Sequence, residues 1–403
     1  MATVTLHELL QPQVILDLIS RTKPGQGKLG RWLGFQPNRF DKDTVSLSGP
    51  ATVNGQTRYV RYNIFNATRV SAGGRAPATG PSVLPQNPMA TVPVTCARFH
   101  SKIPLNYELL GNLSPMIGPN SQIDSMGQGY VRQQSTNLAR VFAYNVELMS
   151  AGMLRGQFYM AQQGDNWNPT LTAPGGTTPT ITVDFKIPAA NKNQLNMLGT
   201  GNIITIPWNN TSAPILTNLD QIKAAFAQIH GYPLKHVWIN STMRMNILNN
   251  TQVRNVGGSA NTSFAEYERV PEKGMDGADM GNEYTMVLRA DPTITWHICD
   301  DTVATGGNLI DPSYSTSTAS LEKLIPDDMA IFSTEPSPDI AKMFLGGEPV
   351  VENPGQPATI RSGYYFWHEY RTQPSVVELI ALLNALPCLY NPLVIAPATV
   401  TGF

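Results

Sequence analysis

Three glycines near the N-terminus form the first spacing that could do chemistry. Gly25, Gly27 and Gly30 match the pattern G-x-G-x-x-G, whose backbone N–H groups cradle a pyrophosphate when a strand precedes it and a helix follows. Here the preceding segment is helix-like or irregular, and Arg31 to Phe35 does not open a clean helix. We therefore expect a flexible arm, and keep a nucleotide-dependent enzyme using Gly25 to Gly30 as an alternative.

Histidines and paired acids are the next residues that could bind a metal or move protons. None of the six histidines has H-E-x-x-H or another metal-ligand spacing. Asp327 and Asp328 follow Pro326, which is typical of a turn, and Asp300 with Asp301 ends an expected strand. No G-x-S-x-G nucleophile motif is present. The sequence therefore predicts no catalytic residue, no metal site and no cofactor.

The three cysteines do not suggest a zinc site or a disulfide framework. Cys96, Cys299 and Cys388 lie far apart and none belongs to a C-x-x-C pair, which fits a reducing compartment. The most apolar region, 376–400, is interrupted by three prolines and a glutamate, so it is too broken to span a bilayer.

A basic and aromatic segment near the N-terminus could contact phosphates or a neighbouring protein. Six basic residues lie within 21–42, interleaved with Trp32 and Phe35. A chain of net charge −1 cannot neutralise much DNA, so we favour an arm that lies on an acidic neighbour. Arg31, Trp32 and Phe35 are the residues of this arm that we expect at a contact between subunits.

Composition points to a surface that is partly covered in the working state. Charged residues make up only 14% of the 403 residues, against roughly 25% in ordinary soluble domains. A monomer with this surface would lack the charge that keeps proteins apart in solution. A large assembly explains the deficit, and a mildly polar enzyme rich in Asn, Thr and Gln is the alternative.

A long helix is predicted over 121–155. Its apolar side chains recur at spacings of three and four and form one stripe: Leu138, Phe142, Val146, Met149 and Met153. The stretch then passes through Gly156 into Gln157 to Met160, which alternates like a strand. We expect this strand to pair with Thr180 to Ile187.

Residues 57–105 are predicted to form a long hairpin. Arg58 to Val70 is one strand and Thr91 to Ile103 the return strand, with a connection rich in Gly and Pro between them. An isolated two-stranded ribbon is marginal in water, so a neighbouring subunit is the natural support. Arg75 is the one charge in the tip and is expected at an intersubunit contact.

The second half of the chain reads as a compact α/β stretch. A helix is predicted from the capping pair Thr217 and Asp220 to Gly231, followed by a strand at HVWIN and a helix at TMRMNILNN. Residues 251–281 are polar and Gly-rich and are expected as a loop. Further strands are predicted at EYTMVLRA, TITWHIC, MAIFS, GYYFWHEY and 376–383.

This order of elements resembles the major capsid proteins of tailed phages, most closely the lambda-type family known as major capsid protein E. The acidic region 260–301 matches that family poorly. The stretches that carry the resemblance are SAGGRAPATGPSVLPQ (71–86), ELMSAGMLRGQFYM (147–160), VDF (183–185), INSTMRMNILNN (239–250), LIPDDMAIFSTEP (324–336) and the closing segment 376–400.

The resemblance implies an α+β protein with the Hong Kong 97-type capsid fold. Its implied parts are an N-terminal arm (1–48), an extended loop (49–105), a peripheral domain with the spine helix (106–215), an axial domain (216–339) and a return to the peripheral domain (340–403).

The resemblance also implies self-assembly into hexamers and pentamers of an icosahedral head that encloses double-stranded DNA. Implied partners are other copies of the chain, scaffold, portal and decoration proteins, and packaged DNA by non-specific proximity, without a membrane. The expected location is the virion, after assembly in the host cytoplasm. An encapsulin-like nanocompartment shell of the same fold, loaded with protein cargo, is the alternative.

Overall fold

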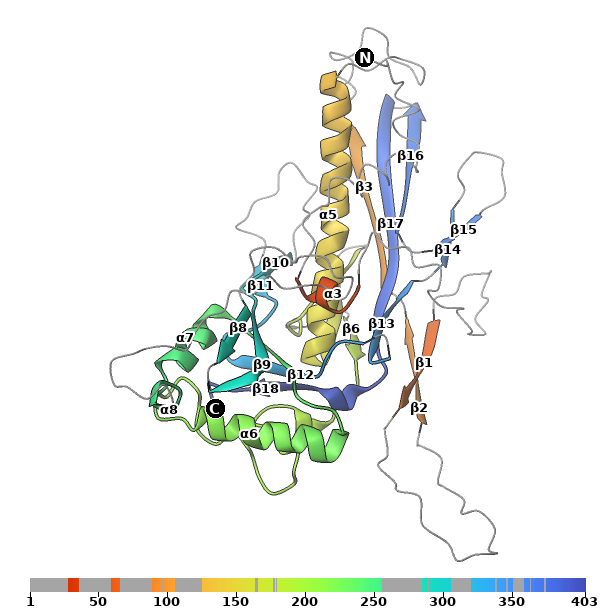
Figure 1. Cartoon of the computed structure of the whole chain (residues 1–403). Helices are drawn as coiled ribbons and strands as arrows, with labels where there is room; N and C mark the ends of the chain where they lie inside the picture. The colour runs from red at the N-terminus through yellow and green to blue at the C-terminus, as the bar shows by residue number, and fades with distance from the viewer. Residues whose placement is uncertain are drawn as a thin grey trace, which may run out of the picture.

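The computed structural model places one long helix beside a long antiparallel sheet, with an α/β lobe at one end of both (Figure 1). Gly25, Gly27, Arg75, Cys96 and the connection 71–86 lie outside the residues that the structure describes. The described residues are 28–35, 59–65, 89–95, 97–105, 125–163, 166–176, 178, 180–255, 285–288, 290–305, 320–337, 339–345, 347–350, 359–362, 364–372 and 375–403.

Helix α5, Ser125–Arg155, is the axis around which the fold is built. The predicted helix over 121–155 is confirmed, with its start at Ser125. It ends because Gly156 adopts a φ of +94° and donates its N–H to the Met153 carbonyl at 3.1 Å. Gly152 permits the reversal of the chain, since a Cβ there would lie 2.6 Å from the Cβ of Phe158.

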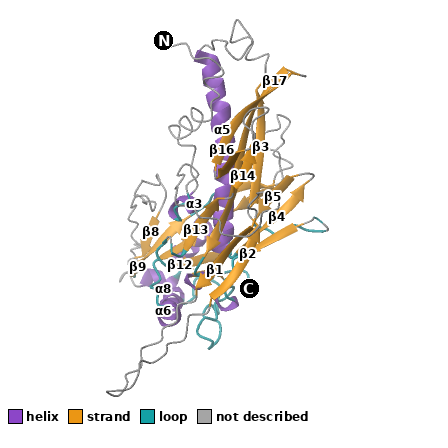
Figure 2. Cartoon of the chain, turned by 90° about the vertical axis from the view of Figure 1, so that its right-hand side faces the viewer, coloured by secondary structure: helices purple, strands orange, loops and turns teal. Residues whose placement is uncertain are grey.

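A four-stranded antiparallel sheet runs along α5 (Figures 1 and 2). Its central strand is β17, Ser375–Leu389, which pairs with β16. It also pairs with β3 over Val377–Ala385 and with β13 over Ala385–Leu389. Alternate β17 side chains such as Leu379 and Leu383 share a buried cluster with Phe142 of α5. The remaining strands are β3 (Ala97–Leu105), β13 (Ala341–Leu345) and β16 (Tyr364–Thr372).

A three-stranded sheet continues from the C-terminal end of α5. The order is β5–β4–β6, with β4 at Gln157–Gln163, β5 at Asn166–Thr170 and β6 at Thr180–Asp184. The predicted pairing of the strand after Gly156 with the strand from Thr180 is confirmed by the antiparallel register of β4 and β6.

The second lobe is a five-stranded sheet in the order β18–β12–β7–β9–β8, covered by helices. Only β7 and β9 run parallel within it. Trp208, Trp296 and Phe332 are fully buried in its core. The elements are β7 (His236–Ile239), β8 (Thr285–Leu288), β9 (Asp291–Ile298), β12 (Met329–Ser333), β18 (Ile395–Thr399), α6 (Ile215–Ala225), η2 (Phe226–His230), α7 (Ser241–Asn249), α8 (Thr251–Asn255), η1 (Ala189–Asn191) and η3 (Pro392–Val394).

Three two-stranded ribbons complete the described elements. The predicted hairpin is confirmed in the antiparallel pairing of β1 with β2, but its return strand is split, because β3 leaves the ribbon to pair with β17. The ribbons are β1 (Tyr59–Phe65) with β2 (Met89–Thr95), β10 (Thr302–Thr305) with β11 (Ser320–Lys323), and β14 (Gly347–Val350) with β15 (Thr359–Ser362).

Three sequence expectations are corrected by the structure. Helix α6 begins at Ile215 after Pro214, so Thr217 and Asp220 lie inside it and form no cap, whereas the predicted end at Gly231 is confirmed by its φ of +75°. The expected loop from 251 starts instead with α8. The segment 340–403 does not belong wholly to the α5 side, because its last strand β18 contacts α5 but pairs with β12 in the five-stranded sheet.

We expect the substitution Phe142→Ala to cost about 3–5 kcal/mol, because its side chain is fully buried between α5 and the long sheet. Thermal unfolding followed by circular dichroism measures the effect. Tyr144→Ala, on the same helix but 47% exposed, is the matched control and should change the midpoint far less. Equal midpoints for the two variants would contradict the assignment of this stripe to the core.

Candidate functional site

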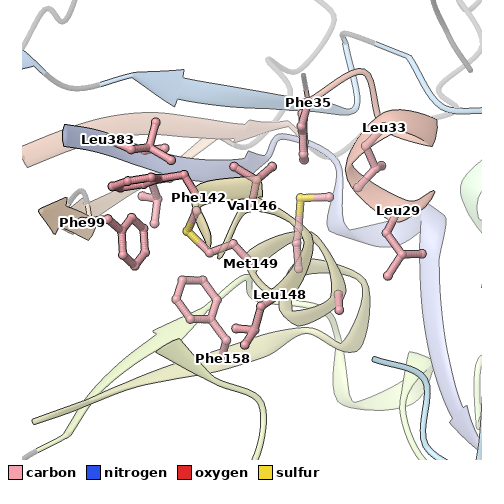
Figure 3. Close-up of a cluster of buried hydrophobic side chains, with 14 of the residues drawn as sticks. Leu29, Leu33, Phe35, Phe99, Phe142, Val146, Leu148, Met149, Phe158 and Leu383 are labelled. Carbon is pink, nitrogen blue, oxygen red and sulfur yellow. The ribbon is translucent and has the colours of Figure 1, made fainter. Parts of the chain in front are cut away.

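The predicted spine-helix residues all lie in one buried cluster. Figure 3 shows Phe142, Val146 and Met149 of α5 directed toward Phe99 of β3 and Leu383 of β17. The exposed fractions are 0% for Leu138, Phe142, Met149 and Met153 and 5% for Val146. This stripe is therefore structural, and it fixes where the rest of α5 presents side chains to other segments.

The arm segment forms a short helix that packs inside the subunit. Helix α3, Lys28–Trp32, begins at the first residue that the structure describes. The side chains of Trp32 and Phe35 are only 4% and 5% exposed. The expected roles of Trp32 and Phe35 at a contact with another subunit are therefore corrected, because the chain's own α5 and five-stranded sheet already cover them. Arg31 is described only through its backbone in α3.

A buried carboxylate fixes α3 to α5. Glu147 is 3% exposed, and its two oxygens accept the backbone N–H groups of Leu29 at 2.5 Å and Gly30 at 2.8 Å. The approach is close, since a Cβ at position 30 would lie 3.2 Å from a Glu147 oxygen and 3.3 Å from Val146, and these neighbours would have to shift slightly. Charge-assisted hydrogen bonds of this kind compensate for burying the carboxylate.

Sequence reasoning missed Glu147, although a signal was present. It is the one carboxylate between Asp124 and Asp165, and it interrupts an otherwise apolar helix segment. A lone acid in such a position indicates a buried partner. What the sequence could not supply is the partner itself, which lies 118 positions away in the chain.

Trp32 joins the arm to the five-stranded sheet. Its ring lies 5.4 Å from His236 and 5.3 Å from Trp238, edge to face in both cases. His236 in turn approaches His297 on the neighbouring strand at 2.8 Å between Nδ1 and Nε2, and its Nε2 lies 2.9 Å from Glu335. The arm therefore links the α5 side of the molecule with the second lobe.

The residues that suggested chemistry from the sequence have structural roles here. Asp300 accepts the N–H of Ser241 at 2.8 Å at the start of α7. Asp327 accepts hydrogen bonds from Lys323 and Asn240 in the turn before β12. Burial raises the pKa of the Cys299 thiol, which makes it a poor nucleophile. Across the described ranges, no group of three or more His, Cys, Asp or Glu is arranged to hold a metal ion.

The glycine pattern likewise does not form a phosphate cradle around Gly30. The N–H of Gly30 is already taken by Glu147, and a phosphate would have to displace that buried negative charge. This arrangement argues against the nucleotide-dependent alternative. Within the part of the chain that the structure describes, no helix is both long and apolar enough to cross a membrane.

His230 is a buried neutral base in the second lobe. It is 4% exposed, and burial lowers the pKa of His230 to about 4. Its Nε2 lies 3.5 Å from the amide nitrogen of Asn191, which also donates to the carbonyl groups of Leu393 and Ile395. The side chain sits at the π-helical end of α6, where it joins η1 and η3.

Large apolar side chains that remain exposed mark candidate contact points on the described surface. They lie on several different elements. They are Tyr144, Ile181, Ile206, Ile229, Met245, Leu321 and Phe403, with exposed fractions between 37% and 70%.

Comparison with known proteins rests on structure alone. No family model and no curated protein matches the sequence. A solved structure assigned as the capsid protein of a prophage from Escherichia coli CFT073 aligns over 99% of this chain and 100% of its own, with a TM-score of 0.50 and 10% identity. The chain has the Hong Kong 97-type capsid fold.

Two further solved structures align with lower scores. A phage-related protein from Bordetella bronchiseptica RB50 shares 11% identity at a TM-score of 0.45, covering 100% of this chain and 99% of that one. The mature capsid of bacteriophage PhiM1 shares 10% identity at a TM-score of 0.39, covering 86% and 83%.

Replacing Glu147 by alanine should release α3. Two buried N–H groups would lose their acceptor, at about 1–3 kcal/mol each. Limited proteolysis of the arm and the unfolding midpoint report the change. Asp220→Ala, at an exposed acid of α6, removes the same charge and should leave both readouts near those of the parent. Resistance of the arm to protease in Glu147→Ala would contradict this role.

Stability should fall as the pH drops from about 6.5 to about 4. His230 takes up a proton near pH 6.5 when the chain is unfolded, but only near pH 4 when it is folded, so acid favours the unfolded state. The loss amounts to roughly 3 kcal/mol across this window. Midpoints measured at pH 7 and pH 4.5 should converge in His230→Gln and stay apart in the exposed control His100→Gln. An unchanged pH dependence in His230→Gln would count against this explanation.

Proposed function

We propose that the chain is the major capsid protein of a tailed phage, which self-assembles as hexamers and pentamers into an icosahedral head around double-stranded DNA. The observation that carries the proposal is the alignment with the prophage protein over nearly the full length of both chains. The order of sequence stretches from 71 to 400 supports the finer assignment to the lambda-type family, major capsid protein E. The role is structural, and the location is the virion.

The ribbons supply physical support for assembly. Among the described strands, β1 and β2 pair only with each other, and isolated two-stranded ribbons of this kind are marginal in water. Contacts that repeat around a closed ring add their modest free energies, so each can be small. A charge fraction of 14% fits a surface of which much is covered by copies of the same chain.

The partners follow from this role. Other copies of the chain are the first, and we infer Arg75 as a residue of the contact that the loop 49–105 makes with a neighbour. Scaffold and portal proteins would act during assembly, and a decoration protein could bind the finished shell. The domain division at 48, 105, 215 and 339 is retained as a working proposal, except that β18 belongs with the five-stranded sheet.

The expressed chain should form particles or capsomers of megadalton scale. Light scattering after size exclusion and negative-stain electron microscopy measure this, and the contents of the particles distinguish a DNA-filled head from a shell that holds protein cargo. A stable monomer over a wide concentration range would contradict the proposal.

Deletion of residues 72–88 provides the matched test of the loop. A segment this rich in Gly and Pro contributes little to a packed core, so the deleted chain should melt near the parent temperature. Closed shells should be lost, because the contact between capsomers would be missing. Normal shells from the deleted chain would refute the role of the loop.

A further inference from the structure

The outward face of α5 is divided into a covered and an uncovered part. Around Glu147 the face is occupied by α3, whose backbone lies against Glu147 and Val146. On the preceding turns, Arg132, Arg140 and Tyr144 are exposed to solvent. In Figure 1, α3 lies against the lower half of α5, and the upper half extends beyond it.

The uncovered part carries a row of side chains that we call the arginine ridge, defined as Arg132, Thr136, Arg140 and Tyr144. Residues four apart on a helix lie next to each other, so these four follow one another along the surface. Arg132 and Arg140 are exposed, Thr136 is half-buried and Tyr144 is 47% exposed. The Cα atoms of Arg132 and Arg140 are about 12 Å apart along the helix axis.

The ridge carries two positive charges that form no ion pair with a described carboxylate. No Asp or Glu occurs between Ser125 and Val146. Among the described residues, every ion pair involves other basic side chains, so neither ridge arginine is neutralised by a described carboxylate. In a chain with only 28 basic residues and 29 acidic ones, this local excess is a distinct feature of α5.

The chemistry of the ridge fits a phosphate backbone better than a protein segment. Arginine, threonine and tyrosine side chains are among those that contact phosphates in nucleic-acid complexes. Gln133, also exposed, adds an amide beside the ridge. An acidic helix or strand from a protein would need an apolar groove to hold its side chains, and Tyr144 is the one large apolar group exposed on the described part of α5.

We propose that the arginine ridge is a non-specific contact site for the phosphate backbone of duplex DNA. The inference rests on the proposed function, which supplies double-stranded DNA at one side of the shell. Two arginines neutralise about two phosphates. The ridge should therefore contribute about −1.8 to the slope of the logarithm of the binding constant against the logarithm of the salt concentration. Contact of this strength holds DNA at the wall without fixing its position.

The test measures binding of a fluorescein-labelled 30-bp duplex by anisotropy at several salt concentrations between 50 and 200 mM. The full-length chain is used in one oligomeric state for all variants. Arg132→Gln with Arg140→Gln should weaken binding by roughly tenfold or more at 100 mM salt and reduce the magnitude of the log–log slope by about 1.8. Arg132→Lys with Arg140→Lys keeps both charges and should retain most of the affinity.

The matched control is Lys235→Gln with Lys342→Gln, which removes two exposed charges from β13 and the segment before β7. It should bind the duplex like the parent. The inference is overturned if the parent does not bind duplex at 50 mM salt, or if the two glutamine variants weaken binding equally. It is also overturned if poly-glutamate of matched charge competes for the ridge more strongly than the duplex does, because the partner would then be an acidic protein.

The same preparations separate this inference from the proposed function. In one outcome, the parent and the double variant Arg132→Gln with Arg140→Gln both form shells and bind DNA with equal affinity. That outcome would support the capsid role and reject the proposed role of the ridge in DNA binding. Failure of the parent to form shells by electron microscopy would instead reject the capsid role, whatever its DNA affinity.

Discussion

The apolar contact between α5 and the strands β3 and β17 determines how the other segments are arranged. Phe142 and Met149 are fully buried in this contact. The buried side chains of the helix and of the two strands belong to one cluster, which also includes residues of the three-stranded and five-stranded sheets. Because a helix has one buried stripe, its remaining circumference is available to other segments. The arm covers the turn around Glu147, and on the earlier turns Arg132, Arg140 and Tyr144 remain exposed to solvent.

Glu147 shows how one polar residue can set the position of a separate segment. Apolar packing alone is non-directional and would allow α3 to slide along α5. Two hydrogen bonds from consecutive N–H groups to one carboxylate allow a single position. Trp32 then brings the arm into contact with His236 and Trp238, so the five-residue helix is packed between α5 and the strand β7 of the five-stranded sheet.

Local patterns were predictable from the sequence, and long-range partners were not. The stripe from Leu138 to Met153 predicted the buried face of α5, since helical periodicity needs no knowledge of the partner. The strand β3 was assigned to the wrong neighbour, because its partner β17 is remote in the chain. The burial of Trp32 was missed for the same reason: a basic, Gly-rich segment gives no periodicity from which to infer a core contact.

The pairing of β3 with β17 has a consequence for how the chain is made. Lys102 of β3 and Glu378 of β17 form an ion pair across the sheet although they lie 276 positions apart. At translation rates of about 5–20 residues per second, β3 waits roughly 14–55 s for its partner strand. During this interval the apolar stripe of α5 and an unpaired strand edge are both uncovered, so nascent chains on one messenger RNA could exchange strands with one another. The order in which the strands are synthesised therefore decides which surfaces the growing chain leaves uncovered, and for how long.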